Sequence, residues 1–133
     1  MIILRQKLYS LSEKDITNII KREFPNVSDK LIFDIEGNIP KNILEKILKD
    51  WKNNIIKNIW NYEKNYATKN NLKESDFISG IKLYSVSYDD FEDEIGLTFE
   101  ASGELEKVYS SDFFWELTFS GINGKIINLL AGD

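Results

Sequence analysis

The chain contains no cysteine and no histidine among its 133 residues. Without cysteine there are no disulfides, no thiol catalysis and no cysteine-ligated metal. Without histidine the usual general base at neutral pH, the common zinc ligand and every Ser-His-Asp or Cys-His arrangement are missing. The seven glycines are dispersed, so phosphate loops of the Walker and Rossmann types are absent too. We therefore expect no metal, no cofactor and no enzymatic activity.

Arginine and long apolar runs are also scarce. Only Arg5 and Arg22 are present, which argues against phosphate recognition. No apolar run approaches the roughly 20 residues that span a bilayer, and the run Met1–Leu4 is too short for a signal-peptide core. The sequence predicts a cytoplasmic protein that binds neither nucleic acid nor membrane.

Charge is divided between the two halves of the chain. Residues 1–73 hold 14 lysines and arginines against 9 acidic residues, a net +5, whereas residues 74–133 hold 3 against 13, a net −10. The length fits one domain over residues 1–133, which is large enough to bury a hydrophobic core without disulfides or a structural metal. An acidic second half predicts a basic partner, because complementary charge speeds association.

Two helices are predicted in the first half. Ser10 and Glu13 form a capping-box pattern that opens a helix of about twelve residues, which Pro25 stops. A longer helix over Lys41–Lys69 has one apolar stripe at helical spacing. The stripe residues are Leu44, Ile47, Leu48, Trp51, Ile55, Ile59, Tyr62 and Tyr66. Trp60 lies off this stripe and is either an exposed partner site or covered by the first helix.

The remaining segments predict an α+β fold with a mainly antiparallel sheet packed on one long and one short helix. Gly121–Gly124 is the clearest hairpin turn, and Lys69–Asp76 is predicted to be a mobile loop. Four C-terminal strands form a meander, joined by one or two N-terminal strands. The predicted strands are Ile2–Tyr9, Lys30–Glu36, Gly80–Tyr88, Ile95–Ala101, Asp112–Ser120 and Lys125–Leu130.

Alternation along the C-terminal strands assigns two faces to the sheet. One face is apolar and should meet the helical stripe; its members are Ile95, Leu97, Phe99, Ala101, Phe113, Trp115, Leu117 and Phe119. The other face mixes aromatic, acidic and small residues, namely Tyr84, Val86, Tyr88, Thr98, Glu100, Phe114, Glu116 and Thr118. Such a face is either solvated or an interface, because tyrosine and phenylalanine supply contact area and carboxylates supply charge complementarity.

The connection between the first two strands of the meander is strongly acidic. It contains Asp89, Asp90, Phe91, Glu92, Asp93 and Glu94. We interpret it as a negative lobe that attracts a basic partner with Phe91 as its anchor, or as a solvated hairpin tip. The spacing of a calcium loop, with its glycine and distal glutamate, is absent.

One carboxylate pair admits a catalytic interpretation. Glu100 and Glu116 fall on one face of strands that can be neighbours, and paired carboxylates hydrolyse glycosides. Acidic residues on a wet sheet face are also ordinary, and no other residue suggests a sugar groove. A small enzyme is therefore the least favoured of the three functions considered.

The chain resembles the immunity proteins that neutralise bacterial polymorphic and contact-dependent toxins. The resemblance lies in a small acidic domain without histidine or cysteine, and in its C-terminal pattern of Phe113–Leu117, a turn and Lys125–Ile127. It implies a non-enzymatic protein that occludes the basic active-site or substrate groove of a cognate toxin domain. The alternative is a stand-alone bacterial domain that binds another protein or a small ligand.

Overall fold

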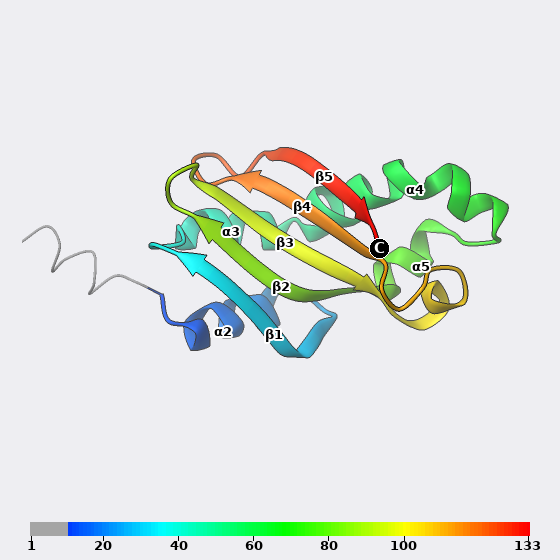
Figure 1. Cartoon of the computed structure of the whole chain (residues 1–133), viewed down its shortest axis with the longest axis horizontal. Coiled ribbons are helices and arrows are strands. Elements are labelled where there is room, and N and C mark those ends of the chain that lie inside the picture. The colour runs from blue at the N-terminus through cyan, green and yellow to red at the C-terminus, as the bar shows by residue number, and fades with distance from the viewer. Residues whose placement is uncertain (1–10) are drawn as a thin grey trace, which may run out of the picture.

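The computed structural model describes residues 11–133 as a five-stranded sheet with helices on one face (Figure 1). The strands follow in the order β1 (Val27–Glu36), β2 (Ile81–Asp89), β3 (Glu94–Ala101), β4 (Phe114–Ser120) and β5 (Ile126–Gly132). Strands β2 to β5 form the predicted antiparallel meander, whereas β1 runs parallel to β2. The α+β class with an antiparallel-rich sheet is confirmed. The predicted strand Ile2–Tyr9 lies outside the described residues.

The helical layer is divided more finely than the sequence predicted. It contains α2 (Glu13–Glu23), α3 (Lys41–Lys49), a π-helical segment (Lys52–Ile56), α4 (Lys57–Lys69) and α5 (Glu74–Gly80). A short 3₁₀ helix (Gly103–Lys107) connects β3 and β4. Within residues 11–133, no helix is both long and apolar enough to cross a membrane. One long and one short helix is thus not the observed arrangement.

Helix α2 begins two residues later than predicted. Its N-cap is Ser12, whose hydroxyl accepts from the Asp15 amide while the Asp15 carboxylate accepts from the Ser12 amide, both at 3.1 Å. These two bonds satisfy amides that the first helical turn leaves without partners. The helix ends at Glu23, before Pro25, as predicted. Its buried residues Ile16, Ile19 and Ile20 pack into the core.

The predicted long helix is interrupted at Asp50. Asp50 leaves helical geometry, and the π-helical segment follows at once. Asparagine side chains bond to carbonyls around the break: Asn54 Nδ2 donates to the Ile47 carbonyl at 3.1 Å, and Asn58 Nδ2 donates to the Asn54 carbonyl at 2.7 Å. The asparagines of this stretch therefore stabilise the irregular backbone, since buried carbonyls need donors.

The break changes which side of α4 is buried. A π turn holds more residues than an α turn, so the apolar stripe rotates around the helix axis. Tyr62 and Tyr66 are 61% and 52% exposed, and the prediction that they face the core is wrong. Glu63 and Ala67 are buried in their place. Upstream of the break, the stripe residues Leu44, Ile47 and Leu48 are fully buried as predicted.

Helix α5 occupies part of the segment predicted to be a mobile loop. The Asp76 carboxylate accepts from the Lys73 amide at 2.8 Å and so starts the helix. The Phe77 ring packs edge-on against Trp60 at 5.4 Å between centroids. Trp60 is therefore partly buried, and one side of its ring packs against α5. The polar composition of residues 69–76 concealed this, because Leu72 is the only core residue of the segment and Phe77 follows it.

The inner face of the sheet closes the core against the helices. Ile95, Leu97, Phe99, Trp115, Leu117 and Phe119 are fully buried, which confirms the assignment of the apolar face. The Gly121–Gly124 turn joins β4 and β5 as predicted, with Gly124 at a φ of 73°, a conformation that glycine adopts without strain. All described helices cover this one face, so the opposite face of the sheet is open (Figure 1).

Candidate functional site

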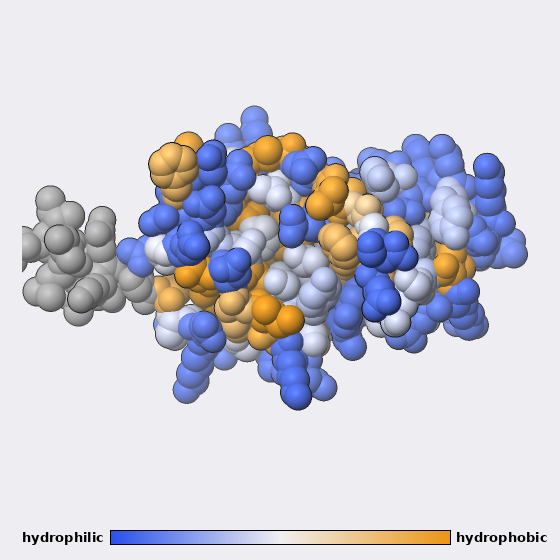
Figure 2. All heavy atoms as spheres, viewed as in Figure 1, coloured by the Kyte–Doolittle hydropathy of each residue, from blue (hydrophilic) through white to orange (hydrophobic). Residues whose placement is uncertain are grey.

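The open face of the sheet carries most of the acidic side chains that strands contribute. Six carboxylates stand there, supplied by Asp34, Glu36, Asp89, Glu94, Glu100 and Glu116. Small polar residues such as Ser87 and Thr118 lie between them. Figure 2 shows this face as a mosaic of hydrophilic and hydrophobic patches. A sheet face of this kind is stable in water and also suits a partner of mixed character.

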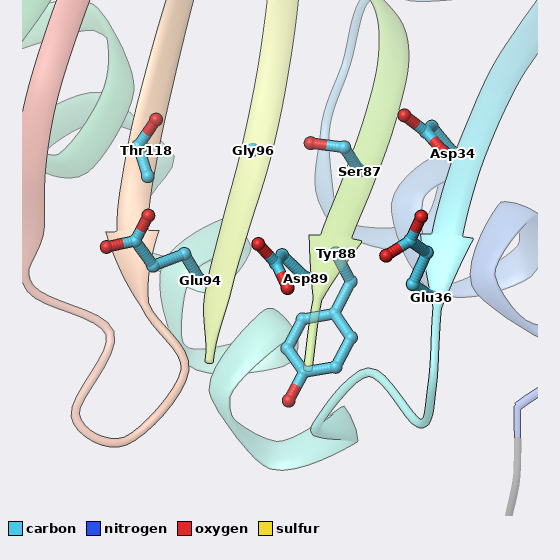
Figure 3. A pocket seen from close by; sticks show the side chains of 8 residues that line it. All are labelled: Asp34, Glu36, Ser87, Tyr88, Asp89, Glu94, Gly96 and Thr118. Carbon is cyan, nitrogen blue, oxygen red and sulfur yellow. The ribbon is translucent and has the colours of Figure 1, made fainter. Parts of the chain in front are cut away.

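Four of these carboxylates surround a hollow at one end of the face. Asp34 and Glu36 come from β1, Asp89 from β2 and Glu94 from β3, as Figure 3 shows. The hollow has a volume of about 260 Å³. Its floor is low because Gly96 has no side chain; a Cβ at this position would overlap the Ser87 hydroxyl. The missing side chain therefore opens the space between the acidic residues.

The register places like charges side by side across three strands. Glu36 is the partner of Asp89 in β1–β2 pairing, and Asp89 is the partner of Glu94 in β2–β3 pairing. Like charges directly opposite each other destabilise a sheet. Within the described part of the chain, none of these side chains forms an ion pair; the observed pairs are Arg22 with Glu23 and Glu45, Lys57 with Glu74, and Lys107 with Glu104. The negative charge of the row is therefore not compensated by an ion pair within the described residues.

The acidic connection between β2 and β3 is a tight turn in which two carboxylates have structural roles. Asp89 Oδ1 accepts from the amides of Phe91 at 2.9 Å and Glu92 at 3.4 Å. Asp93 Oδ1 accepts from the Tyr88 hydroxyl at 2.7 Å. Asp90 and Glu92 are exposed and free of such bonds in the described structure. Phe91 is 90% exposed at the tip, next to the acidic row.

Tyr88 does not lie on the open face, contrary to the prediction. The register of β2 shifts between Leu83 and Ser85, so Tyr84 is an extra residue in a β-bulge. The bulge reverses the alternation, and Val86 and Tyr88 then point inward, with Tyr88 only 7% exposed. Its hydroxyl nevertheless reaches the turn and the margin of the hollow. Tyr88 therefore lies on the inner side of the sheet and holds the acidic turn through its hydrogen bond to Asp93.

Alkaline titration of Tyr88 should be visible in the stability of the protein. Burial, and then the hydrogen bond to Asp93, raises the pKa of Tyr88 to about 12, whereas tyrosine in an unfolded chain titrates near 10. Between these values the unfolded chain loses a proton that the folded protein keeps, so the free energy of unfolding should fall as the pH rises. Chemical denaturation from pH 9 to 12 measures this decline. The Tyr88→Phe variant should show a shallower decline, and an unchanged slope would contradict the assignment.

The other predicted residues lie farther along the open face. Tyr84, Glu100 and Glu116 are half-buried neighbours there, and burial together with the two negative charges raises the pKa of Tyr84. Phe114 is the cross-strand partner of Glu100. Lys82 is the partner of Glu100 on the other side, which gives this end of the face a cation that the hollow lacks.

Sequence reasoning missed three acidic residues of interest. Asp34 and Glu36 lie in the predicted strand Lys30–Glu36, but the sequence did not connect them to the acidic turn, because that connection depends on the parallel pairing of β1 with β2. Glu63 was missed because it is a lone carboxylate in a helix thought to be unbroken. The spacing Ile59, Glu63, Ala67 is the only signal that could have found it.

The described carboxylates do not form a metal centre. Across residues 11–133, no three acidic, histidine or cysteine residues are grouped closely enough to hold a metal ion. No protein-family model, curated protein or solved structure matches this chain.

Proposed function

We propose that this domain binds a basic protein partner through the hollow and the acidic turn, and catalyses no reaction of its own. The observation that carries the proposal is the row formed by Glu36, Asp89 and Glu94, three carboxylates on adjacent strands without a cationic partner in the described structure. Adjacent strands lie about 4.8 Å apart, so the row spans about 10 Å. Lysine and arginine side chains of a partner would supply the missing countercharge.

The surroundings of the row favour a protein over a small ion. The hollow is shallow and continues into the rest of the open face. Ile32 and Leu130 are exposed apolar side chains on the outer strands of that face, and Phe91 projects at its end. Interfaces typically combine such apolar anchors with charged residues at their rim. In this arrangement the carboxylates would steer the partner and the apolar side chains would slow its release.

The partner class that we propose is a toxin domain with a basic active-site or substrate groove. An acidic sheet face that enters such a groove would block it by occlusion, without any chemistry at the carboxylates. The support is the match between the open acidic face and a basic groove, together with the resemblance in size and composition to immunity proteins. A binding domain for a different basic protein is the alternative.

Two charge variants of equal net charge test the proposal. The first replaces Asp34, Glu36, Asp90 and Glu94 by their amides and spares Asp89 and Asp93, which hold the turn. The second replaces Glu13, Glu104, Glu106 and Asp112 by their amides, away from the row. Binding to an inactivated candidate toxin domain with a basic groove is followed by stopped flow at low and high salt.

We expect the first variant to associate about 10- to 100-fold more slowly at low salt, and the second to behave nearly as the parent. The difference should shrink at physiological ionic strength, where screening acts over about 8 Å. Equal slowing in both variants would mean that net charge alone acts and that the row is not the binding surface. An unchanged rate in both would also overturn the proposal.

A further inference from the structure

Another carboxylate, which does not belong to the acidic row, is buried among aromatic side chains. Glu63 of α4 is 6% exposed. Its Oε1 accepts from the Tyr109 hydroxyl at 2.8 Å and its Oε2 accepts from the Trp115 indole nitrogen at 3.0 Å. Burial, and then the bond to Glu63, raises the pKa of Tyr109, so this hydroxyl stays protonated and donates. Both oxygens of Glu63 are thus held by neutral donors.

No cation of the described chain neutralises Glu63. The ion pairs within residues 11–133 involve other carboxylates. Buried acidic groups are usually paired with a positive charge, because hydrogen bonds from neutral donors replace the lost hydration only in part. This arrangement leaves a place for a positive charge supplied from outside.

A cavity next to Glu63 would let a positively charged ligand reach this carboxylate. It has a volume of about 450 Å³ and is lined by Glu63, Tyr66, Tyr109, Phe113 and Asp133, among others. It lies near the beginning of β4, whereas the hollow of the open face lies near the other end of that strand. Volumes of 300–1,000 Å³ are typical of small-molecule sites.

Three aromatic side chains, those of Tyr66, Tyr109 and Phe113, form part of the cavity wall. The ring centroids of Tyr66 and Tyr109 are 5.8 Å apart, and those of Tyr109 and Phe113 are 5.1 Å apart. Tyr66 is half exposed and stands at the solvent side. The faces of aromatic rings carry negative potential and attract cations, above all alkylated ammonium groups, which need no hydrogen-bond acceptor. Glu63 and Asp133 add negative charge, and no lysine or arginine lines the cavity.

We infer that this cavity binds a small quaternary ammonium compound of the choline type. An anion would meet two carboxylates, and a neutral apolar ligand would leave both without countercharge. A primary ammonium has three N–H donors that need acceptors, whereas a trimethylammonium group has none and gains more from contact with aromatic rings. The three rings together with Glu63 match a trimethylammonium group best. This site is distinct from the proposed protein-binding face and does not depend on it.

Titration with choline tests the inference, followed by the Trp115 indole N–H resonance and by calorimetry. The control ligand is 3,3-dimethylbutan-1-ol, which has the shape of choline without its charge. We expect saturable binding of choline and at least tenfold weaker binding of the alcohol. Equal binding of both, or no binding of choline at millimolar concentration, would overturn the inference.

Two tyrosines of α4 provide matched variants. Tyr66→Ala removes a wall of the cavity and should weaken choline binding tenfold or more. Tyr62→Ala removes a ring of similar exposure on the same helix that does not line the cavity, and it should leave binding unchanged. Both positions are exposed, so the variants should fold. The amide variant of the open face should also bind choline as the parent does, which separates this inference from the proposed function.

Discussion

Replacing Trp115 by alanine is expected to lower the free energy of unfolding by about 3–5 kcal/mol, the usual range for a buried tryptophan. The Trp115 side chain is fully buried on the inner face of β4 and contacts the rings of Phe77, Tyr109 and Phe113. Its removal would leave a cavity between the sheet and α5. It would also leave Oε2 of Glu63 without its donor. Urea denaturation of the parent and the variant measures the loss.

The neighbouring residue offers the control for this prediction. Phe114 is a large aromatic side chain of the same strand, but it points to the open face and is only half buried. The Phe114→Ala variant should lose less than about 1.5 kcal/mol, because solvent already reaches part of the ring. Similar losses in the two variants would mean that the faces of β4 are assigned wrongly.

Replacing Glu63 by glutamine should lower the free energy of unfolding by about 1–3 kcal/mol. Glutamine keeps the shape of the side chain; its Oε1 would accept from the Trp115 indole, and its NH₂ group would donate to the Tyr109 hydroxyl, which can also accept. The variant thus replaces two hydrogen bonds to a charged group, each contributing about 1.5–3 kcal/mol, by two neutral ones of about 1 kcal/mol each.

The control for Glu63 is an exposed carboxylate that also has a partner. Glu104 forms an ion pair with Lys107 at 2.9 Å on the surface, and Glu104→Gln should lose less than about 1 kcal/mol. Thermal and urea denaturation of both variants would give the comparison. If Glu63→Gln were as stable as the parent, the two hydrogen bonds would contribute little and the carboxylate would not be the centre of this cluster.

The sequence predicted the sheet more accurately than the helices. Hairpin turns and alternation are local signals, and they correctly identified the meander and the buried face of β3 and β4. The helical stripe was correct as far as Ile59, because Ile55 and Ile59, downstream of the break, are fully buried as well. It was wrong for Tyr62 and Tyr66, since an interruption by Asp50 and a π turn depends on packing that the apolar spacing does not encode.

The same distinction holds for the candidate sites. Local sequence patterns identified the acidic turn. They also identified the sheet face that carries Glu100, Phe114 and Glu116. One irregularity, the bulge at Tyr84, was enough to reverse the side on which Tyr88 lies. Asp34 and Glu36, as well as Glu63 with its two donors, required pairs of residues that are far apart in sequence. Their proximity results from the tertiary fold alone.

The parallel pairing of β1 with β2 makes the hollow depend on the longest connection in the sheet. Strands β2 to β5 meet their neighbours across two turns and one 3₁₀-helical connection, whereas Glu36 meets Asp89 only after α3, α4 and α5 have been traversed. Closing such a long loop has a high entropic cost, so contacts of this kind form late in folding. We therefore expect the half of the hollow on β2 and β3 to form locally and β1 to complete it last. Because β1 is also an edge strand, any partner that contacts Asp34 and Glu36 would stabilise the docking of that strand and would link its own binding to the final step of folding.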